Sequence, residues 1–449
     1  MPVMGIVADD LTGASTVGTL LARRKARASV FFDIDTVLES QETAKLDVIL
    51  ISTDSRSLLP KEAYKKVKKA VEGLKTTGVR YFQKRIDTTC RGGVGVEIDA
   101  VLDSLPGTVA IVVPAMPQSR RILVGGYSVI DGEALVNTHA AKDVLTPVKE
   151  AYIPRLIGNQ TKRKVGFVAL DKVLSGVAAI EEALKEQKEC GCEIIVVDAI
   201  TQEDVRSIAE ASVSLKWDVV SVDPGPFTIE MAKIRNLIGK EEPRNLPEYI
   251  EAGRTVLIAA GSATEVTKKQ MEQFCRDKRH VRISVDPLLL GGGGTGYWNE
   301  AARAAEAAEI LLQGENQRAR AILFETALHD DRLDLENLDK KLCYEKGTSG
   351  KKINAGLAEI IAQVLERTKK DRIAGIYMTG GDTMASVCRR LGAESIMAED
   401  YVIPQADVGR LSGGKYNGLP IIGKGGLTGN DEIVYDIVER LFREYERRD

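Results

Sequence analysis

Short, continuous apolar runs alternate with longer amphipathic segments along this chain, and this alternation limits the fold more than any other feature of the sequence. Amphipathic patterns such as GASTVGTLLARR and KEAYKKVKKAVEGLK have the apolar spacing of helices that cover a core. Apolar strands that alternate with such helices are typical of parallel sheets covered on both faces. In the first half we predict strands within VMGIVA, ASVFFD, DVILIS, VRYFQK, TVAIVV, KVGFVA, EIIVVD and DVVSVD.

The chain has 449 residues, more than one hydrophobic core normally organises, so two domains are expected. The alternation stops over residues 239–253, GKEEPRNLPEYIEAG, where prolines and charges predict a connector. It resumes with strands predicted within RTVLIAA, HVRISVD, RAILFET, RIAGIYMTGG and LPIIGKGG. We therefore predict an α/β protein of two three-layer domains, residues 1–238 and 254–449, with mainly parallel sheets that face a central cleft.

Charged and hydroxyl side chains follow four strands of the first half. Asp9 and Asp10 follow the first strand, TDSR follows DVILIS, RIDTTCRGG follows VRYFQK, and PAMPQSRR follows TVAIVV. Ligands of open α/β sheets bind at the carboxyl ends of the strands. Arg and Lys suit a carboxylate, and aspartates accept hydrogen bonds from hydroxyls, so we predict a pocket for a small polyhydroxylated acid. Helix capping explains any single one of these residues equally well, and the prediction depends on the four ends together.

Small residues mark three strand-to-helix junctions of the second half, at residues 261–264, 379–383 and 424–429. Free backbone amides and the helix dipole attract phosphate at such a junction, and glycine lets the anion approach the backbone. One junction alone is an ordinary turn. Three in one domain predict a site for a nucleotide polyphosphate.

Two other glycine-containing stretches are given structural interpretations. GTSGKK, residues 347–352, lacks the spacing of a phosphate-binding P-loop, and we predict a polar turn before the helix INAGLAEII. GGGGTGYWNE, residues 291–300, is predicted to be a flexible linker, with a flap over a ligand as the alternative.

The net charge, the absence of a long apolar segment and the few histidines argue against nucleic acid, a membrane and a histidine-rich metal site. A formal net charge of −3 gives no electrostatic case for nucleic acid, which usually binds a basic face, and it leaves room for a local basic pocket. We see no membrane span and no signal peptide, so a cytoplasmic protein with reduced cysteines is expected. His139, His280 and His329 are far apart in sequence, so no histidine-rich metal site is predicted and the metal ligands stay unknown.

The ordered motifs ADDLTGA, TDSR, KRIDTTCRGGVG, PAMPQSRR, GSATEVTKKQ, TGGDT and GKGGLTG resemble those of the four-carbon acid sugar kinase family. The likeness runs from Asp9 to Gly429, with Thr88 and Cys90 where that family usually has Ser and Leu. It implies a sugar-acid domain followed by an ATP domain, and phosphorylation of threonate, erythronate or an oxo-tetronate.

The resemblance and the strand-end argument together give the candidate site residues. The predicted substrate-binding residues are Asp9, Asp10, Arg56, Lys84, Arg85, Ile86, Asp87, Thr88 and Arg91. The predicted ATP-binding residues are Ser262, Gly380, Gly381, Asp382, Thr383 and Gly425.

The predicted reaction places the acid's carboxylate near Arg56 and Lys84 and its hydroxyl near the γ-phosphate, with Mg²⁺ bridging phosphate oxygens. Asp382 is expected to orient Mg²⁺ or accept the hydroxyl proton, and helix capping explains it equally well. Asp87 and Asp9 are rival candidates for the base. A ribokinase-like sugar kinase and a sugar-acid sensor without ATP turnover are the alternative functions. The sequence leaves open which acid and which hydroxyl react, and a homo-oligomer is compatible with it.

Overall fold

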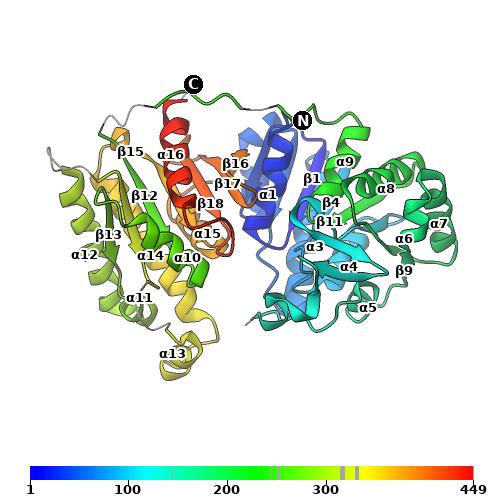
Figure 1. The fold of residues 1–449 in the computed structure, drawn as a ribbon, viewed down its shortest axis with the longest axis horizontal. Helices are drawn as coiled ribbons and strands as arrows, with labels where there is room; N and C mark the ends of the chain where they lie inside the picture. The colour runs from blue at the N-terminus through cyan, green and yellow to red at the C-terminus, as the bar shows by residue number, and fades with distance from the viewer. Residues whose placement is uncertain (144, 243, 250–252, 314–318, 329–332, 448–449) are drawn as a thin grey trace. The chain divides into compact units, whose positions relative to one another are not determined.

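The computed structural model describes residues 1–143, 145–242, 244–249, 253–313, 319–328 and 333–447. The chain forms two compact units, Met1–Glu242 and Pro243–Asp449, called here the N-terminal and C-terminal units (Figure 1). Each unit has its own strands and helices, which confirms the predicted α/β fold with two domains. Of the predicted connector 239–253, residues 243 and 250–252 lie outside the described residues.

The N-terminal unit is built on a parallel sheet. Its strands are β1 (Met4–Ala8), β2 (Ala28–Phe31), β3 (Val48–Ser52), β4 (Tyr81–Arg85), β5 (Val109–Val112), β9 (Val165–Val168), β10 (Ile194–Val197) and β11 (Val219–Asp223). They lie in the order β2-β3-β1-β4-β11-β5-β10-β9, and all neighbours are parallel. Each apolar run predicted in this half coincides with one of these strands, and only β4 extends beyond its run, by the one residue Arg85. The central strand β1 is buried over its whole length, as expected for a sheet covered on both faces.

Helices fill the connections between these strands. They are α1 (Leu11–Ala22), α2 (Ile34–Glu39), α3 (Pro60–Thr76), α4 (Val94–Ser104), α5 (Ile153–Gly158), α6 (Leu170–Leu174), α7 (Val177–Glu189), α8 (Gln202–Ser214) and α9 (Pro226–Ile234). Helix α1 packs on β1, β2 and β3, whereas α3 and α4 pack on each other and on β1, β4 and β5. Helix α1 begins three residues after β1, whereas longer loops, which carry most of the predicted site, separate β3 from α3 and β4 from α4.

A small antiparallel sheet of β6 (Arg121–Val124), β7 (Tyr127–Ile130) and β8 (Glu133–Ala134) was not predicted. Its first turn is fastened by Asp198, which follows β10 and accepts hydrogen bonds from the amides of Gly125 and Gly126 at 2.7 and 2.9 Å. A third amide, that of Leu170, donates to the same carboxylate at 3.1 Å. One buried carboxylate thereby joins the hairpin to the main sheet.

The C-terminal unit has a mixed sheet. Its strands are β12 (Thr255–Ala260), β13 (His280–Ser284), β14 (Ala321–Glu325), β15 (Ile373–Thr379), β16 (Ser395–Tyr401), β17 (Ala406–Ser412) and β18 (Pro420–Lys424). Within the unit the order is β13-β14-β12-β15-β18-β17-β16. The predicted strands pair in parallel, and the unpredicted β16 and β17 form an antiparallel hairpin beside β18.

The helices of this unit are α10 (Glu265–Phe274), α11 (Pro287–Gly292), α12 (Gly294–Gln313), α13 (Leu335–Lys341), α14 (Thr348–Arg367), α15 (Gly381–Arg390) and α16 (Ile433–Glu446). Among the described residues of the chain, no helix combines the length and the apolar character needed to cross a lipid bilayer.

The two glycine-containing stretches are helical, so both structural interpretations were wrong. Residues 291–300 end α11 and begin α12, because Asp286 caps α11 through the amides of Leu288 and Leu289 and because α12 buries its alanines. Residues 348–352 form the first turn of α14. The cap of α14 comes from the distant Asp339, which accepts hydrogen bonds from the amides of Gly347 and Ser349 at 2.6 and 2.8 Å.

Candidate functional site

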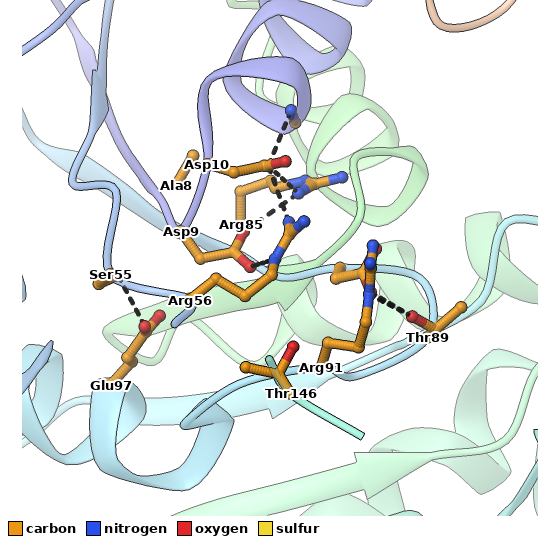
Figure 2. A network of polar contacts seen from close by, with 12 residues as sticks. Ala8, Asp9, Asp10, Ser55, Arg56, Arg85, Thr89, Arg91, Glu97 and Thr146 are labelled. Carbon is orange, nitrogen blue, oxygen red and sulfur yellow. Dashed lines mark hydrogen bonds and ion pairs between the residues drawn. The ribbon is translucent and has the colours of Figure 1, made fainter. Parts of the chain in front are cut away.

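The predicted polar pocket lies at the carboxyl edge of the N-terminal sheet. Ala8 at the end of β1 is in register with Ser52 at the end of β3 and with Arg85 at the end of β4. Residues that follow these strands therefore meet at one edge, and Figure 2 shows Asp9, Asp10, Arg56 and Arg85 pointing toward one another.

Two arginines share two aspartates in this cluster. Arg56 Nε donates to Asp9 Oδ2 at 2.6 Å, and its Nη2 forms an ion pair with Asp10 Oδ1 at 2.8 Å. Arg85 Nη1 donates to Asp9 Oδ1 at 3.1 Å and to Asp10 Oδ1 at 2.9 Å. Burial raises the pKa of Asp9, but Arg56, Arg85 and Lys84 outweigh it and lower that pKa to about 2. Asp9 is therefore ionised at every physiological pH.

The start of helix α1 shapes the same cluster. Asp10 caps the helix by accepting a hydrogen bond from the Gly13 amide at 2.9 Å, so capping and site geometry use the same carboxylate. The Arg85 guanidinium lies against the helix backbone at Gly13, where a Cβ atom would stand 1.8 Å from Nη1. Glycine at this position gives Arg85 its place.

Asp87 and Arg91 extend the site along the loop after β4. Arg91 Nε donates to Asp87 Oδ2 at 2.7 Å, and Thr89 donates its hydroxyl to the same oxygen. Figure 2 shows Arg91 beside Thr89. On its other side, Arg91 Nη1 donates to Asp143 Oδ2 at 3.0 Å. Burial raises the pKa of Asp87, but Arg56, Arg91 and Arg85 hold it well below the usual range. Asp143 was missed because it lies in a loop without a local signature.

Lys84 lies beneath the cluster and is completely buried. Its ammonium pairs with Glu97 Oε2 of α4 at 2.7 Å and donates to the Arg85 carbonyl at 2.6 Å. The other oxygen of Glu97 accepts a hydrogen bond from Ser55 Oγ at 2.7 Å. Lys84 and Arg85 point to opposite faces of the sheet because successive strand residues alternate. Glu97 was missed, although a glutamate on the apolar face of the α4 pattern was a usable signal.

The remaining predicted substrate-binding residues of the loop after β4 are also buried. Ile86 and Thr88 are buried, and the Ile86 amide donates to the Asp223 carbonyl at 3.2 Å. Cys90 follows with φ 51° and is buried. Burial, together with the nearby Asp87 and Asp9, raises the pKa of the Cys90 thiol far above its usual value, so the sulfur stays protonated.

The structure brings the three small-residue junctions of the C-terminal unit together. The Gly380 amide donates to the Lys424 carbonyl at 3.0 Å, and Thr264 Oγ1 donates to the Gly426 carbonyl at 2.6 Å. A Cβ at Gly426 would lie 2.4 Å from Ser262 Oγ. The loops after β12, β15 and β18 therefore form one surface.

The first turn of α15 belongs to this surface. Gly380 has φ 95° and precedes Gly381, Asp382 and Thr383, and Thr383 Oγ1 donates to Asn354 Oδ1 at 2.8 Å. The surface combines glycine backbone, hydroxyl groups and one carboxylate at a helix start. This donor set suits the phosphates of a nucleotide.

No metal site of protein ligands alone is found in the described part of the chain, where no three His, Cys, Asp or Glu residues form a suitable group. His280 is buried against Phe274 with Nδ1 2.8 Å from the Phe274 carbonyl, a structural role, and His139 lies in a surface turn. His329 lies outside the described residues. Mg²⁺ bound with ATP needs only one or two protein carboxylates, and Asp382 fits that requirement.

Sequence profiles of two known domains match the chain in order. A profile described as "Sugar-binding N-terminal domain" matches residues 4–231, and one described as "Nucleotide-binding C-terminal domain" matches residues 257–434. The two candidate surfaces fall within these two matches.

Curated relatives align over nearly the whole chain. A D-erythronate kinase of Heliobacterium modesticaldum is 36% identical over 97% of this chain and 96% of its own length. A D-threonate kinase of Salmonella typhimurium is 27% identical over 96% and 97%. A 3-oxo-tetronate kinase of Actinobacillus succinogenes is 25% identical over 90% and 91%.

Solved structures share the fold. A crystal structure of a Salmonella typhimurium LT2 protein has a TM-score of 0.76 at 20% identity and covers 100% of this chain and 99% of its own. A structure of a Haemophilus influenzae protein has a TM-score of 0.71 at 23% identity and covers 98% of both chains.

Proposed function

The chain belongs to the four-carbon acid sugar kinase family, and from that membership we propose that it transfers the γ-phosphoryl group of ATP to a hydroxyl of a four-carbon sugar acid. D-erythronate is the first substrate to test, because the D-erythronate kinase of H. modesticaldum shares 36% of its residues with this chain.

The observation that carries the proposal is the interlocked cluster of arginines and aspartates at the N-terminal sheet edge. Guanidinium groups bind a carboxylate through paired N–H donors, and Arg56, Arg85 and Arg91 lie within this one cluster. The ionised carboxylates of Asp9 and Asp87 would accept hydrogen bonds from the hydroxyls of the substrate. A neutral sugar would not need the arginines.

The low pKa values of Asp9 and Asp87 bear on their roles. A general base works best when its pKa lies near the operating pH. We therefore assign both aspartates to orienting the hydroxyl. The loose transition state of phosphoryl transfer depends mainly on positioning and charge stabilisation.

On the nucleotide side, Ser262, Gly380–Thr383 and Gly425 would hold the ATP phosphates. When bound, Mg²⁺ supplies positive charge to the transferring phosphoryl group. Asp382 is the residue that would hold it, directly or through water.

An ADP-release assay across a panel of acids tests the proposal. We expect ATP turnover that depends on a four-carbon acid, with the highest kcat/KM for D-erythronate among D-erythronate, D-threonate, L-threonate and 3-oxo-tetronates. Erythritol, which lacks the carboxylate, is expected to give no turnover. ATP binding without turnover on any acid would support the sensor alternative, and turnover on neutral sugars would support a ribokinase-like enzyme.

Gly13→Ala tests the placement of Arg85. The new Cβ would meet the guanidinium at 1.8 Å and push it away from Asp9 and Asp10. We expect kcat/KM for the acid to fall about 100-fold, the effect of displacing a positioning group by about 1 Å, with ATP affinity unchanged. Gly158→Ala in α5 is the matched control, because a Cβ there meets nothing within 4 Å. Equal kinetics for both variants would show that Arg85 is not a substrate ligand.

A further inference from the structure

Lys424 occupies an unusual position at the candidate nucleotide surface. It ends β18 immediately before Gly425, and only 2% of it is exposed. Its ammonium turns back under the following loop and donates to the carbonyls of Gly425 and Thr428 at 2.9 and 3.0 Å. The side chain thereby fixes the turn that contains Gly425 and Gly426.

A second buried side chain holds the same loop. Gln270 Nε2 of α10 lies 3.0 Å from each of the carbonyls of Thr428, Gly429 and Asn430. Lys424 and Gln270 therefore bind several loop carbonyls from below. The amides of Gly426 and Leu427 have no acceptor among the described residues of the chain. Amides left free in this way form a surface for an anion.

The Lys424 ammonium has no ion-pair partner among the residues that the structure describes. The elements packed on β18 carry the following charged groups: Asp382, Arg389 and Arg390 on α15, Asp407 and Arg410 on β17, and Asp436, Glu439, Arg440, Arg443, Glu444 and Glu446 on α16. The hydrogen bonds of the Lys424 ammonium within the described chain go to two uncharged backbone carbonyls, in contrast to the buried Lys84, which pairs with Glu97. Burial alone lowers the pKa of Lys424 to about 8. A buried charge is costly unless an opposite charge neutralises it.

From this geometry we infer that Lys424 is a positioning residue for the nucleotide, which fixes the 425–428 turn and supplies the positive charge that the ATP phosphates neutralise. The inference rests on the proposed function, because it takes the anion at this surface to be the triphosphate. The inference adds Lys424, which lies beneath the glycine loop, to the predicted ATP-binding residues that line the loop.

The pH dependence of ATP affinity tests this assignment in the wild-type protein. Phosphates bind the protonated lysine better than the neutral one. The affinity for ATP is therefore highest below the lysine pKa of about 8 and declines as the pH rises through that value. We expect ATP affinity measured by calorimetry to fall by about 10- to 30-fold between pH 7 and 9.5. The phosphates, with a second pKa of about 6, are mostly ionised throughout this range, and their remaining ionisation would strengthen binding to a cation as the pH rises. Adenosine, which lacks the phosphates, is expected to bind equally at each pH.

The Lys424→Met variant shows whether the pH dependence of ATP affinity comes from Lys424 or from another titrating group. We expect this variant to bind ATP at pH 7 at least about tenfold more weakly than the wild type, with no further loss at pH 9.5. Lys341→Met, on the exposed side of α13, is the matched control and should retain the wild-type pH profile.

The possible results are distinguishable. Wild-type protein that binds ATP equally at pH 7 and 9.5 overturns the assignment of Lys424 while the proposed kinase function stands. Wild-type protein that binds no ATP at any pH overturns the function itself. If Lys424→Met does not fold, the wild-type series decides the question.

Discussion

Arg56→Ala is expected to lower kcat/KM for the sugar acid by about 100- to 1,000-fold, the effect of removing one preorganised donor from a charged site. Arg56 contacts Asp9 and Asp10 at once and lowers the pKa of Asp87. Without it, the substrate carboxylate would approach several aspartates with fewer positive charges to compensate them. Steady-state kinetics with the best acid of the panel give the measurement, and ATP affinity measured by calorimetry should not change.

Two further variants sharpen this result. Arg56→Lys keeps a positive charge but lacks the planar fork that reaches two carboxylates, so it should recover only a small part of the activity. Arg206→Ala removes an exposed arginine of α8 and should behave as wild type. If Arg56→Ala kept the wild-type kcat/KM, the substrate would bind elsewhere.

Glu97→Ala is expected to lower the free energy of unfolding of the N-terminal unit by about 3–5 kcal/mol, because it leaves a buried cation without its partner. The cation is Lys84, which is completely buried and lies 2.7 Å from Glu97. The Ser55 hydroxyl would lose its acceptor as well. Urea unfolding followed by circular dichroism measures the change, with each transition analysed separately because two units are present.

The double variant Lys84→Met and Glu97→Ala tests the cause of that loss. It removes both charges, so most of the lost stability should return, as it does when apolar residues replace a buried ion pair. Glu186→Ala, on the exposed side of α7, should change the stability by less than about 0.5 kcal/mol. A double variant no more stable than Glu97→Ala would indicate that lost packing, and not the unpaired charge, causes the effect.

The predicted strands were confirmed because parallel strands buried on both faces read as continuous apolar runs. The β16–β17 hairpin was missed because its strands carry charges, which the structure uses in ion pairs with α16. Arg440 of α16, for example, pairs with Asp400 of β16 at 2.7 Å. The helical start at Gly294 was missed because glycine is a weak helix former and the packing of the later alanines decides that segment.

The site was predictable where it follows the topology of the sheet. Asp9, Arg56 and Arg85 cluster because the ends of neighbouring parallel strands meet at one edge. Asp143 reaches the cluster from a distant loop, where nothing in the local sequence shows its partner. Glu97 comes from α4, where its place on the apolar face indicates a buried partner without showing that the partner is Lys84. How individual residues bind substrate and nucleotide stays a prediction.

The central loop of the proposed sugar-acid pocket contains a cysteine, Cys90, that is buried and protonated. Peroxides and electrophiles attack the thiolate form of an accessible cysteine. The Cys90 thiol is neither accessible to these reagents nor negatively charged, whereas Cys190 and Cys343 are exposed. Oxidative stress and alkylating agents should therefore modify the surface of this protein first and spare the loop on which its proposed chemistry depends.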